Sequence, residues 1–512
     1  MIDETVARPA IPLGRDTTLT AKDVLRVARG DASVGFSDAA KQAVNASRSI
    51  VEDYVREGIV AYGITTGFGK FKDKIIRPED CEALQRNLLR SHACGVGQLF
   101  DEVEVRAMMT VRLHSLAQGY SGIRLKMLEL AAEMLNRGVT PCVPSQGSVG
   151  SSGDLAPLSH MGLVLMGEGE ATVGAEPLPG DEALTSVDLQ PMTFAAKEGL
   201  AWTNGTSVMT GLAALSMQRC AALVQLADIA CALSLEALRG CADALDVRIH
   251  AVRRQTGQME SAAFLRALTN GSKLVDAERK RIQDGYSLRC APQVHGAARD
   301  MLSFGATITE RELNAVTDNP LIFADHAILS GGNFHGEPIA LSMDACGMAV
   351  AEIANISERR TARMLDPSTN EGLPAFLVPA AKAGLNSGLM IPQYVAAALA
   401  SENKGLAHPA SVDSIPTSAN QEDHVSMGTT AARKLRNIIE NTENVLAIEL
   451  LTAAQALEFL DKKKLGIGTK AAYQIIRKYV SPLEDDRMFS KDIDVLKRNI
   501  CVILEAALSA VS

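Results

Sequence analysis

The tripeptide Ser151-Ser152-Gly153 has the residue types and the order needed to make an electrophile from the backbone itself. The amide nitrogen of Gly153 can attack the carbonyl carbon of Ser151 and close a five-membered ring around Ser152. Loss of two waters, one of which carries the Ser152 hydroxyl, leaves a methylidene-imidazolone (MIO) with an exposed exocyclic alkene. Glycine suits the third position because it has no Cβ to obstruct the tight backbone approach. No natural side chain is a good electrophile, so such a ring does chemistry that otherwise calls for a cofactor.

The same segment also fits an ordinary glycine-serine turn that precedes a helix. In that interpretation Asp154 is the N-cap of the helix and Pro157 lies in its first turn. A Ser-Gly-Asp tripeptide by itself favours the turn, because short motifs occur often by chance.

Two other segments present side chains that can bind or react. The glycine-rich loop 61–69 carries Tyr62, and it is not a phosphate-binding loop because no Gly-Lys-Ser/Thr follows it. Gln283, Tyr286 and Arg289 are spaced three apart, so a helical or 3₁₀ turn places them on one face. Arginine is the side chain best matched to a substrate carboxylate. The alternatives are a loop with a packed tyrosine and a solvated polar turn.

Over residues 147–158 the chain resembles the signature of the aromatic amino acid ammonia-lyase and aminomutase family, in which the ring forms from Ala-Ser-Gly. This chain has Ser151 in place of the alanine, at the residue that contributes only its carbonyl and side chain to the reaction. The resemblance extends from about Tyr54 to Leu460 through separated motifs in consistent order. It implies an MIO built from Ser151-Ser152-Gly153, no external cofactor, and a helical homotetramer whose sites draw on several subunits.

The resemblance also implies roles for single residues. Tyr62 matches the tyrosine of a mobile lid loop and would be the general base, whereas Tyr286 would be a second phenol near the reacting carbon. Arg289 would hold the substrate carboxylate, with Gln283 beside it among the binding residues. Asn204 matches the family asparagine that supports the oxygen of the electrophile, and Phe334 matches an aromatic residue of the pocket wall. Without the resemblance, Asn204 is a turn or cap residue and Phe334 a core residue.

Two positions concern the substrate ring. The pair Ser91-His92 stands where relatives that act on phenylalanine or tyrosine usually carry Phe-Leu or His-Leu, and Glu422 stands where they carry glutamine. A histidine and a carboxylate can hydrogen-bond both nitrogens of an imidazole. A phenyl ring would leave each group unpaired, at a cost of roughly 1–3 kcal/mol. The pattern resembles the members that act on histidine, and implies loss of ammonia from L-histidine to give trans-urocanate.

Three alternatives remain open at this point. The chain could deaminate tyrosine or phenylalanine, or it could be a 2,3-aminomutase that returns the ammonia to the β-carbon. The third alternative is an inactive homologue that only binds a ligand, because Ser151 prevents ring closure. A catalytic metal is not expected, because His335-Gly336-Glu337 and Glu422-Asp423-His424 lack the HExxH spacing.

The bulk properties limit the class of protein. The net charge of −9 with no long basic run argues against nucleic acid or an anionic membrane as the main partner. Nine scattered cysteines without a CxxC pair indicate reduced thiols. The first residues lack a basic segment followed by an apolar one, and polar residues interrupt the apolar stretch 221–238. We therefore expect a cytoplasmic protein whose partners are a small amino acid and other copies of itself.

The elements that must position these residues are mainly helices, because the chain is rich in Ala, Leu and Met and only 4% aromatic. We expect an N-terminal region (1–200) with the lid and electrophile loops, a long central helical bundle (201–460), and a C-terminal helical segment (461–512). The first 20 residues should be a loose arm, followed by a helix capped by Thr20. Residues 170–190 should form a hairpin or surface loop. Further helices are expected over 206–239, from 310 onward, over 343–364 and over 431–459.

Overall fold

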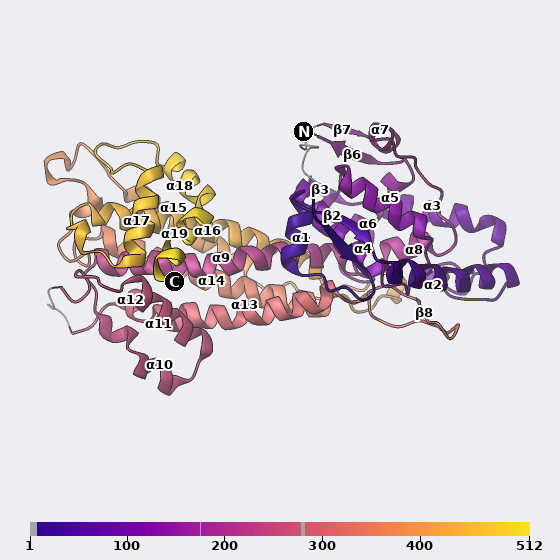
Figure 1. Cartoon of the computed structure of the whole chain (residues 1–512), viewed down its shortest axis with the longest axis horizontal. Helices are drawn as coiled ribbons and strands as arrows, with labels where there is room; N and C mark the ends of the chain where they lie inside the picture. Colours follow the sequence, from indigo (N-terminus) through magenta and orange to yellow (C-terminus); the bar gives the residue numbers. More distant parts are fainter. Residues whose placement is uncertain (1–7, 175, 278–281) are drawn as a thin grey trace. The chain divides into compact units, whose positions relative to one another are not determined.

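The computed structural model describes residues 8–174, 176–277 and 282–512. Helices make up 60% of the chain and strands 7%, which confirms the mainly helical fold. Figure 1 labels the elements. Within the described residues the α-helices are α1 (Ala21–Ala28), α2 (Asp38–Glu57), α3 (Cys81–His92), α4 (Glu102–Leu116), α5 (Leu125–Asn136), α6 (Leu155–Leu165), α7 (Gly180–Thr185), α8 (Glu198–Thr203), α9 (Ser207–Ala237), α10 (Val247–Arg253), α11 (Thr256–Leu268), α12 (Tyr286–Arg289), α13 (Ala291–Leu313), α14 (Glu337–Leu365), α15 (Met390–Leu406), α16 (Gly428–Leu457), α17 (Ile467–Tyr479), α18 (Phe489–Arg498) and α19 (Ile500–Val511).

The strands are short and form small separate sheets. They are β1 (Ala10–Leu13), β2 (Ser33–Phe36), β3 (Val96–Leu99), β4 (Val139–Pro141), β5 (Pro144–Gln146), β6 (Glu170–Val173), β7 (Pro177–Pro179), β8 (Leu321–Ile322) and β9 (Ile328–Leu329). The pair β1–β2 is parallel, whereas β3–β5, β4–β6–β7 and β8–β9 are antiparallel. The β6–β7 hairpin confirms the expectation for residues 170–190, and α7 follows it directly.

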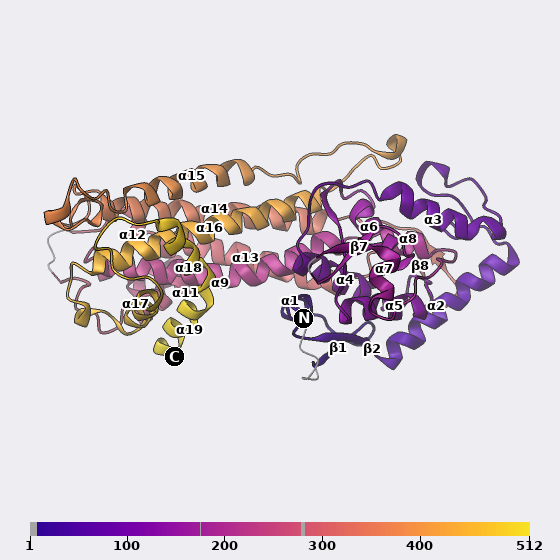
Figure 2. The ribbon, with the colours of Figure 1, turned by 90° about the horizontal axis from the view of Figure 1, so that it is seen from above.

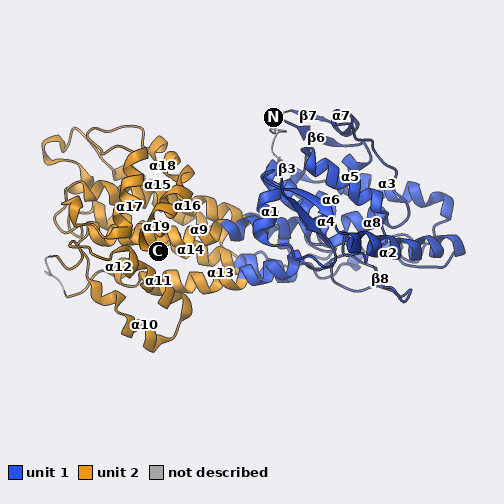
Figure 3. Ribbon diagram, viewed as in Figure 1, with its two compact units in different colours: residues 1–218, 305–344, 409–433 blue, residues 219–304, 345–408, 434–512 orange. Residues whose placement is uncertain are grey.

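The chain forms two compact units, coloured separately in Figure 3. Unit 1 consists of residues 1–218, 305–344 and 409–433, and unit 2 of residues 219–304, 345–408 and 434–512. Both units are discontinuous in sequence because the boundary falls within α9, α13, α14 and α16. The division into 1–200, 201–460 and 461–512 stays a prediction.

Unit 2 contains a helical bundle. An apolar cluster joins α14, α15 and α16 through Ala354, Ala396 and Val445, and Figures 1 and 2 both draw these helices side by side. Buried polar contacts tie further helices to them, since the Arg360 guanidinium on α14 pairs with Glu449 on α16. The Glu449 carboxylate also accepts a hydrogen bond from Ser234 of α9, at 2.7 Å. Long helices that pack around shared buried groups are the architecture expected from the sequence.

The beginning of the described chain differs from the loose arm that we expected. Residues Ala10–Leu13 form β1, which pairs in parallel with β2. Alternate side chains are buried, with Ile11 and Leu13 facing inward, and this alternation holds a strand in place despite Pro12. The next expectation is confirmed: Thr20 caps α1 in a capping box with Asp23.

The long helices agree with the periodicity, with one exception. Helices α9, α14 and α16 occupy the expected ranges to within six residues at each end. The helix expected from residue 310 onward is wrong, because α13 ends at Leu313 and a loop with the short β8–β9 pair follows. Asp318, Pro320 and the Gly331-Gly332 pair after that point do not favour a helix.

Helices α9 and α14 are long and apolar enough to span a membrane by length and composition. Their most apolar windows are nevertheless 83% and 61% buried within the protein. Such burial is typical of core helices, which agrees with the expectation for residues 221–238.

Candidate active site

The electrophile segment lies between β5 and α6 in unit 1 and is held from both sides by one residue. The amide of Gly205 donates to the Ser152 carbonyl at 3.0 Å, and the Gly205 carbonyl accepts from the Asp154 amide at 2.8 Å. Gly153, between them, has φ +79°, and a Cβ there would lie 2.0 Å from the Gly205 oxygen. Only glycine fits this position. Among the described residues, no hydrogen bond engages the Gly153 amide nitrogen.

Asp154 is fully buried and organises the loop rather than α6. It occupies the N-cap position of α6, as the sequence indicates, but its carboxylate makes no cap hydrogen bond to that helix. One oxygen instead accepts from the amides of Val208 and Met209 at the start of α9, both at 3.0 Å. The other accepts from the hydroxyls of Ser148, at 3.1 Å, and Thr429. Burial raises the pKa of Asp154, and these hydrogen bonds oppose that rise.

Tyr62 lies half-buried in the loop that follows α2. Its phenol oxygen accepts a hydrogen bond from the Gly69 amide at 3.4 Å. Burial raises the pKa of Tyr62, the negative charge of Glu422 raises it further, and the Gly69 bond lowers it. A phenol can act as a base only when ionised, so a cation must reach this site before Tyr62 can take a proton near neutral pH.

Glu422 contacts the electrophile segment, and its charge acts on His92. One Glu422 oxygen accepts from the Ser152 hydroxyl at 3.4 Å, and the other accepts from the Thr417 hydroxyl at 2.9 Å. Burial lowers the pKa of His92, although the Glu422 charge opposes this. The Ser91 hydroxyl donates to the Leu88 carbonyl and lies 3.0 Å from His92 Nδ1.

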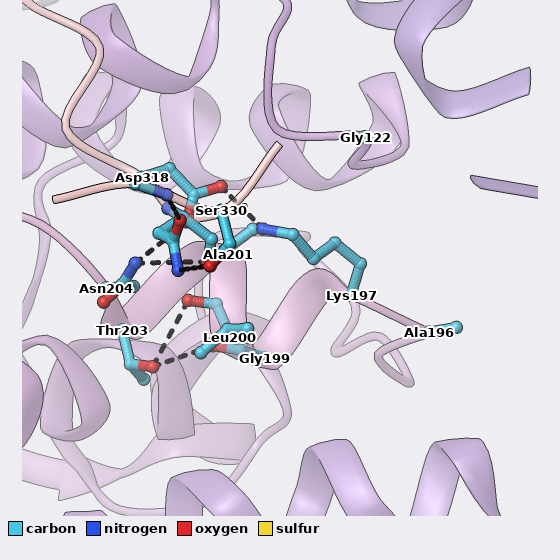
Figure 4. Close-up of polar contacts among 12 residues, drawn as sticks. Gly122, Ala196, Lys197, Gly199, Leu200, Ala201, Thr203, Asn204, Asp318 and Ser330 are labelled. Atoms are coloured by element: carbon cyan, nitrogen blue, oxygen red, sulfur yellow. Dashed lines mark hydrogen bonds and ion pairs between the residues drawn. The ribbon is translucent and has the colours of Figure 1, made fainter. Parts of the chain in front are cut away.

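Asn204 and Phe334 also belong to unit 1. Asn204 is the C-cap of α8, and its amide donates to Asp318 Oδ1 at 3.4 Å and to the Asn319 carbonyl at 3.3 Å. Its side chain is thus engaged with a buried carboxylate (Figure 4). Phe334 is half-buried in the turn before α14. The roles expected for these two residues stay predictions.

Gln283, Tyr286 and Arg289 lie in unit 2, on and just before α12. The Arg289 guanidinium donates to the Gln283 amide oxygen and lies over the Tyr286 ring, 4.5 Å from its centroid. The three side chains therefore meet, as the spacing predicts, although only Tyr286 and Arg289 lie on the helical turn. Tyr286 is 71% exposed, so this cluster presents an aromatic and a cationic group to the surroundings of unit 2.

A histidine–carboxylate cluster neighbours the site in sequence. Possible ligand atoms of His335, Glu337 and His424 lie within 4.8 Å of one another, and the two imidazoles are stacked. His335 Nδ1 accepts from the Glu337 amide at 3.3 Å, which places the proton of the neutral ring on Nε2. A protonated Nε2 donates hydrogen bonds and does not bind a metal. The expectation of a metal-free site stays a prediction.

The sequence argument missed the groups beneath the loop. Lys197 and Asp318 form an ion pair of 2.7 Å whose side chains are 0% and 1% exposed. Arg112, also buried, donates to the Ala201 carbonyl and to the Ser207 hydroxyl. Burial lowers the pKa of Arg112 to about 10. No local signal marks these contacts, because 121 residues separate Lys197 from Asp318.

Residues 19–478 match the family model described as aromatic amino acid lyase, and the chain belongs to that family. Histidine ammonia-lyase from Alkaliphilus metalliredigens is 53% identical over 478 residues, which cover 93% of this chain and 94% of that protein. The solved structure of histidine ammonia-lyase from Trypanosoma cruzi is 40% identical with a TM-score of 0.91, and covers 98% of this chain and 96% of that one. Tyrosine aminomutase from Streptomyces globisporus is 38% identical with a TM-score of 0.92, and covers 98% and 99%.

Proposed function

We propose that the protein is a histidine ammonia-lyase that converts L-histidine to trans-urocanate and ammonia through an MIO formed from Ser151-Ser152-Gly153. The observation that carries the proposal is the convergence of Glu422 on the Ser152 hydroxyl, because it joins a group suited to an imidazole with the residue that becomes the electrophile. The near-full-length similarity to proteins named histidine ammonia-lyase supports the same reaction.

The electrophile segment fits the ring. Gly205 fixes both neighbours of Gly153, and the lack of space for a Cβ matches the requirement for glycine in ring closure. The serine at 151 is buried, with 6% of its surface exposed. Once formed, the ring supplies an electrophilic alkene that activates the substrate for loss of ammonia.

The residues around the ring handle the proton and the imidazole. Tyr62 takes the β-proton as general base after its pKa has been lowered by a cation. Glu422 accepts a hydrogen bond from the single N–H of the neutral imidazole, and the His92 ring donates to the other ring nitrogen. A phenyl ring offers neither group, which disfavours the phenylalanine alternative, and a phenol has no second nitrogen to match the pair.

Arg289 holds the substrate carboxylate, and Tyr286 and Gln283 orient it. This cluster belongs to unit 2, whereas the ring-binding groups and the electrophile belong to unit 1. We assign the cluster to the site of a neighbouring copy in a homotetramer, as the resemblance implies. Its exposed Tyr286–Arg289 pair supports this assignment, because such a pair gains contacts on assembly. Arg289 would also be the cation that promotes ionisation of Tyr62.

We place the enzyme in the cytoplasm. None of the nine cysteines, all of which are described, forms a disulfide, which suits a reducing compartment.

The deciding experiment is ultraviolet absorbance over time after L-histidine is added to the purified protein. Parallel samples receive L-tyrosine and L-phenylalanine. We expect an increase with histidine alone, because conjugated urocanate absorbs and the site is built for an imidazole. If absorbance increased at an equal rate with tyrosine or phenylalanine, the assignment of His92 and Glu422 to the substrate ring would be overturned. No change with any substrate, in a chain of uncyclised mass, would mean that Ser151 prevents maturation.

A further inference from the structure

A buried ion pair connects the two ends of α8. Lys197, at the N-cap of this six-residue helix, has a positive φ and donates to Asp318 Oδ2. Asn204, at the C-cap, donates to Asp318 Oδ1. One carboxylate thus binds both ends of the helix, and Figure 4 shows Lys197 and Asn204 on either side of it. Asp318 also accepts from the Asn319 amide at 2.6 Å, which fixes its own backbone.

Gly205, which follows the C-cap of α8, holds the electrophile segment. Gly205 follows Asn204 directly and makes both hydrogen bonds that flank Gly153. The surroundings of Gly205 are closely packed: a Cβ there would lie 2.6 Å from the Thr317 hydroxyl and 2.8 Å from Arg112 Nη1. Thr317 precedes Asp318, so the loop that carries the Asp318 carboxylate also packs against Gly205.

We propose that Lys197 and Asp318 are positioning residues for ring closure: they fix Asn204-Gly205, against which residues 152–154 are held for attack by the Gly153 nitrogen. The inference rests on the proposed function, because it concerns formation of the electrophile. Neither residue touches the reacting atoms. Their contribution is to hold the backbone near the geometry of reaction before any substrate is present.

The step itself requires no further reactant. The Gly153 nitrogen forms a bond to the Ser151 carbonyl carbon, and its proton passes to the carbonyl oxygen. The resulting hydroxyl leaves as water with the proton of the Ser152 nitrogen, and a C=N bond forms. The Ser152 hydroxyl then leaves with its α-proton as a second water, and the exocyclic C=C bond forms. No atom is oxidised or reduced by an outside agent, so the folded chain alone must organise the reaction.

The test is the intact mass of newly synthesised full-length protein at intervals after synthesis, which reports the two lost waters independently of activity. We compare the parent chain with Lys197→Met and Asp318→Asn. We expect ring closure to slow by about 100-fold in both variants, the effect of misplacing reacting groups by about 1 Å. The matched control is Arg106→Met, because Arg106 is equally buried in unit 1 but donates only to the carbonyls of Val27, Ala28 and Leu135.

The outcomes separate the two proposals. Slow closure in both variants with parental closure in Arg106→Met supports the positioning role. Closure at the parental rate in folded Lys197→Met and Asp318→Asn overturns it, and slow closure in all three variants reduces it to general stability. If Lys197→Met does not fold by circular dichroism, Asp318→Asn decides alone, since asparagine keeps the volume and the acceptor for Asn204. A parent chain that never loses two waters would instead contradict the proposed function.

Discussion

The electrophile segment of unit 1 and the α12 cluster of unit 2 are built in opposite ways. The first is clamped by Gly205, by Asp154 and, beneath them, by the buried pair of Lys197 and Asp318. The second is anchored from below, where Arg360 donates to the Ser287 carbonyl at 3.3 Å, but its functional side chains contact mainly one another and Tyr286 is exposed. A group that must form by reaction within the chain needs a rigid frame beforehand. A group that recognises a carboxylate can become ordered when subunits and substrate meet.

Removing the reacting hydroxyl tests the first region most severely. Ser152→Ala cannot form the exocyclic alkene, so turnover of histidine should fall by about 10⁶-fold, the lower range of enzymatic rate enhancement. Urocanate absorbance measures the loss, and intact mass confirms the missing dehydration. Turnover equal to that of the parent would refute the MIO mechanism.

Tyr62→Phe removes the proposed base and leaves the electrophile in place. We expect kcat to fall by about 10²–10⁴-fold, the usual contribution of a general base. A base works in its deprotonated form, and the pKa of Tyr62 is raised in the isolated chain. The parent's kcat/KM should therefore rise with pH as the phenol ionises, and this rise should be absent from the variant. A rise that persists in Tyr62→Phe would assign it to another group.

Mixing two inactive variants tests whether the two regions of one site come from different chains. Tyr62→Phe and Arg289→Ala subunits, co-expressed with different tags, should form hybrids in which about a quarter of the sites carry both intact residues by random assortment. Activity should reappear to that extent in purified hybrids. Each variant alone is the control. Hybrids as inactive as the parent variants would place both residues of a site in the same chain.

Glu422→Gln sharpens the comparison within unit 1. The amide carries no charge and accepts at one atom instead of two, so kcat/KM for histidine should fall by roughly 10–100-fold, the range set by about 1–3 kcal/mol per unpaired group. Residual turnover of phenylalanine, if measurable, should be unchanged or higher. Equal losses for the two substrates would remove Glu422 from ring recognition.

Arg289→Lys should give the smallest effect. Lysine keeps the charge but loses the paired hydrogen bonds of the guanidinium, so KM for histidine should rise about tenfold while kcat changes little. Steady-state kinetics separates the two constants. A large fall in kcat at unchanged KM would show that Arg289 acts on the proton transfer rather than on binding.

The sequence predicted contiguous features better than distant ones. The Thr20 cap and the meeting of Gln283, Tyr286 and Arg289 depend on local spacing, which the chain displays directly. The position of Asp154 at the start of α6 was predicted, but the partners of its carboxylate at the start of α9 were not, because they come from residues 208 and 209. The pairing of Lys197 with Asp318 depends on tertiary packing and has no counterpart in local periodicity. Helix periodicity near 310 likewise could not reveal that α13 ends there.

The hydrogen bond between Ser152 and Glu422 has a consequence for the order of events in the life of the protein. In the proposed ring closure, the hydroxyl that satisfies this carboxylate oxygen is one of the groups expelled as water. Maturation therefore vacates an acceptor at the moment when it creates the electrophile. Before dehydration, the serine competes with an imidazole for Glu422, and afterwards the competitor is gone. The Ser152 hydroxyl thus occupies Glu422 until the ring has formed. The electrophile and the group that recognises the substrate ring then become available together.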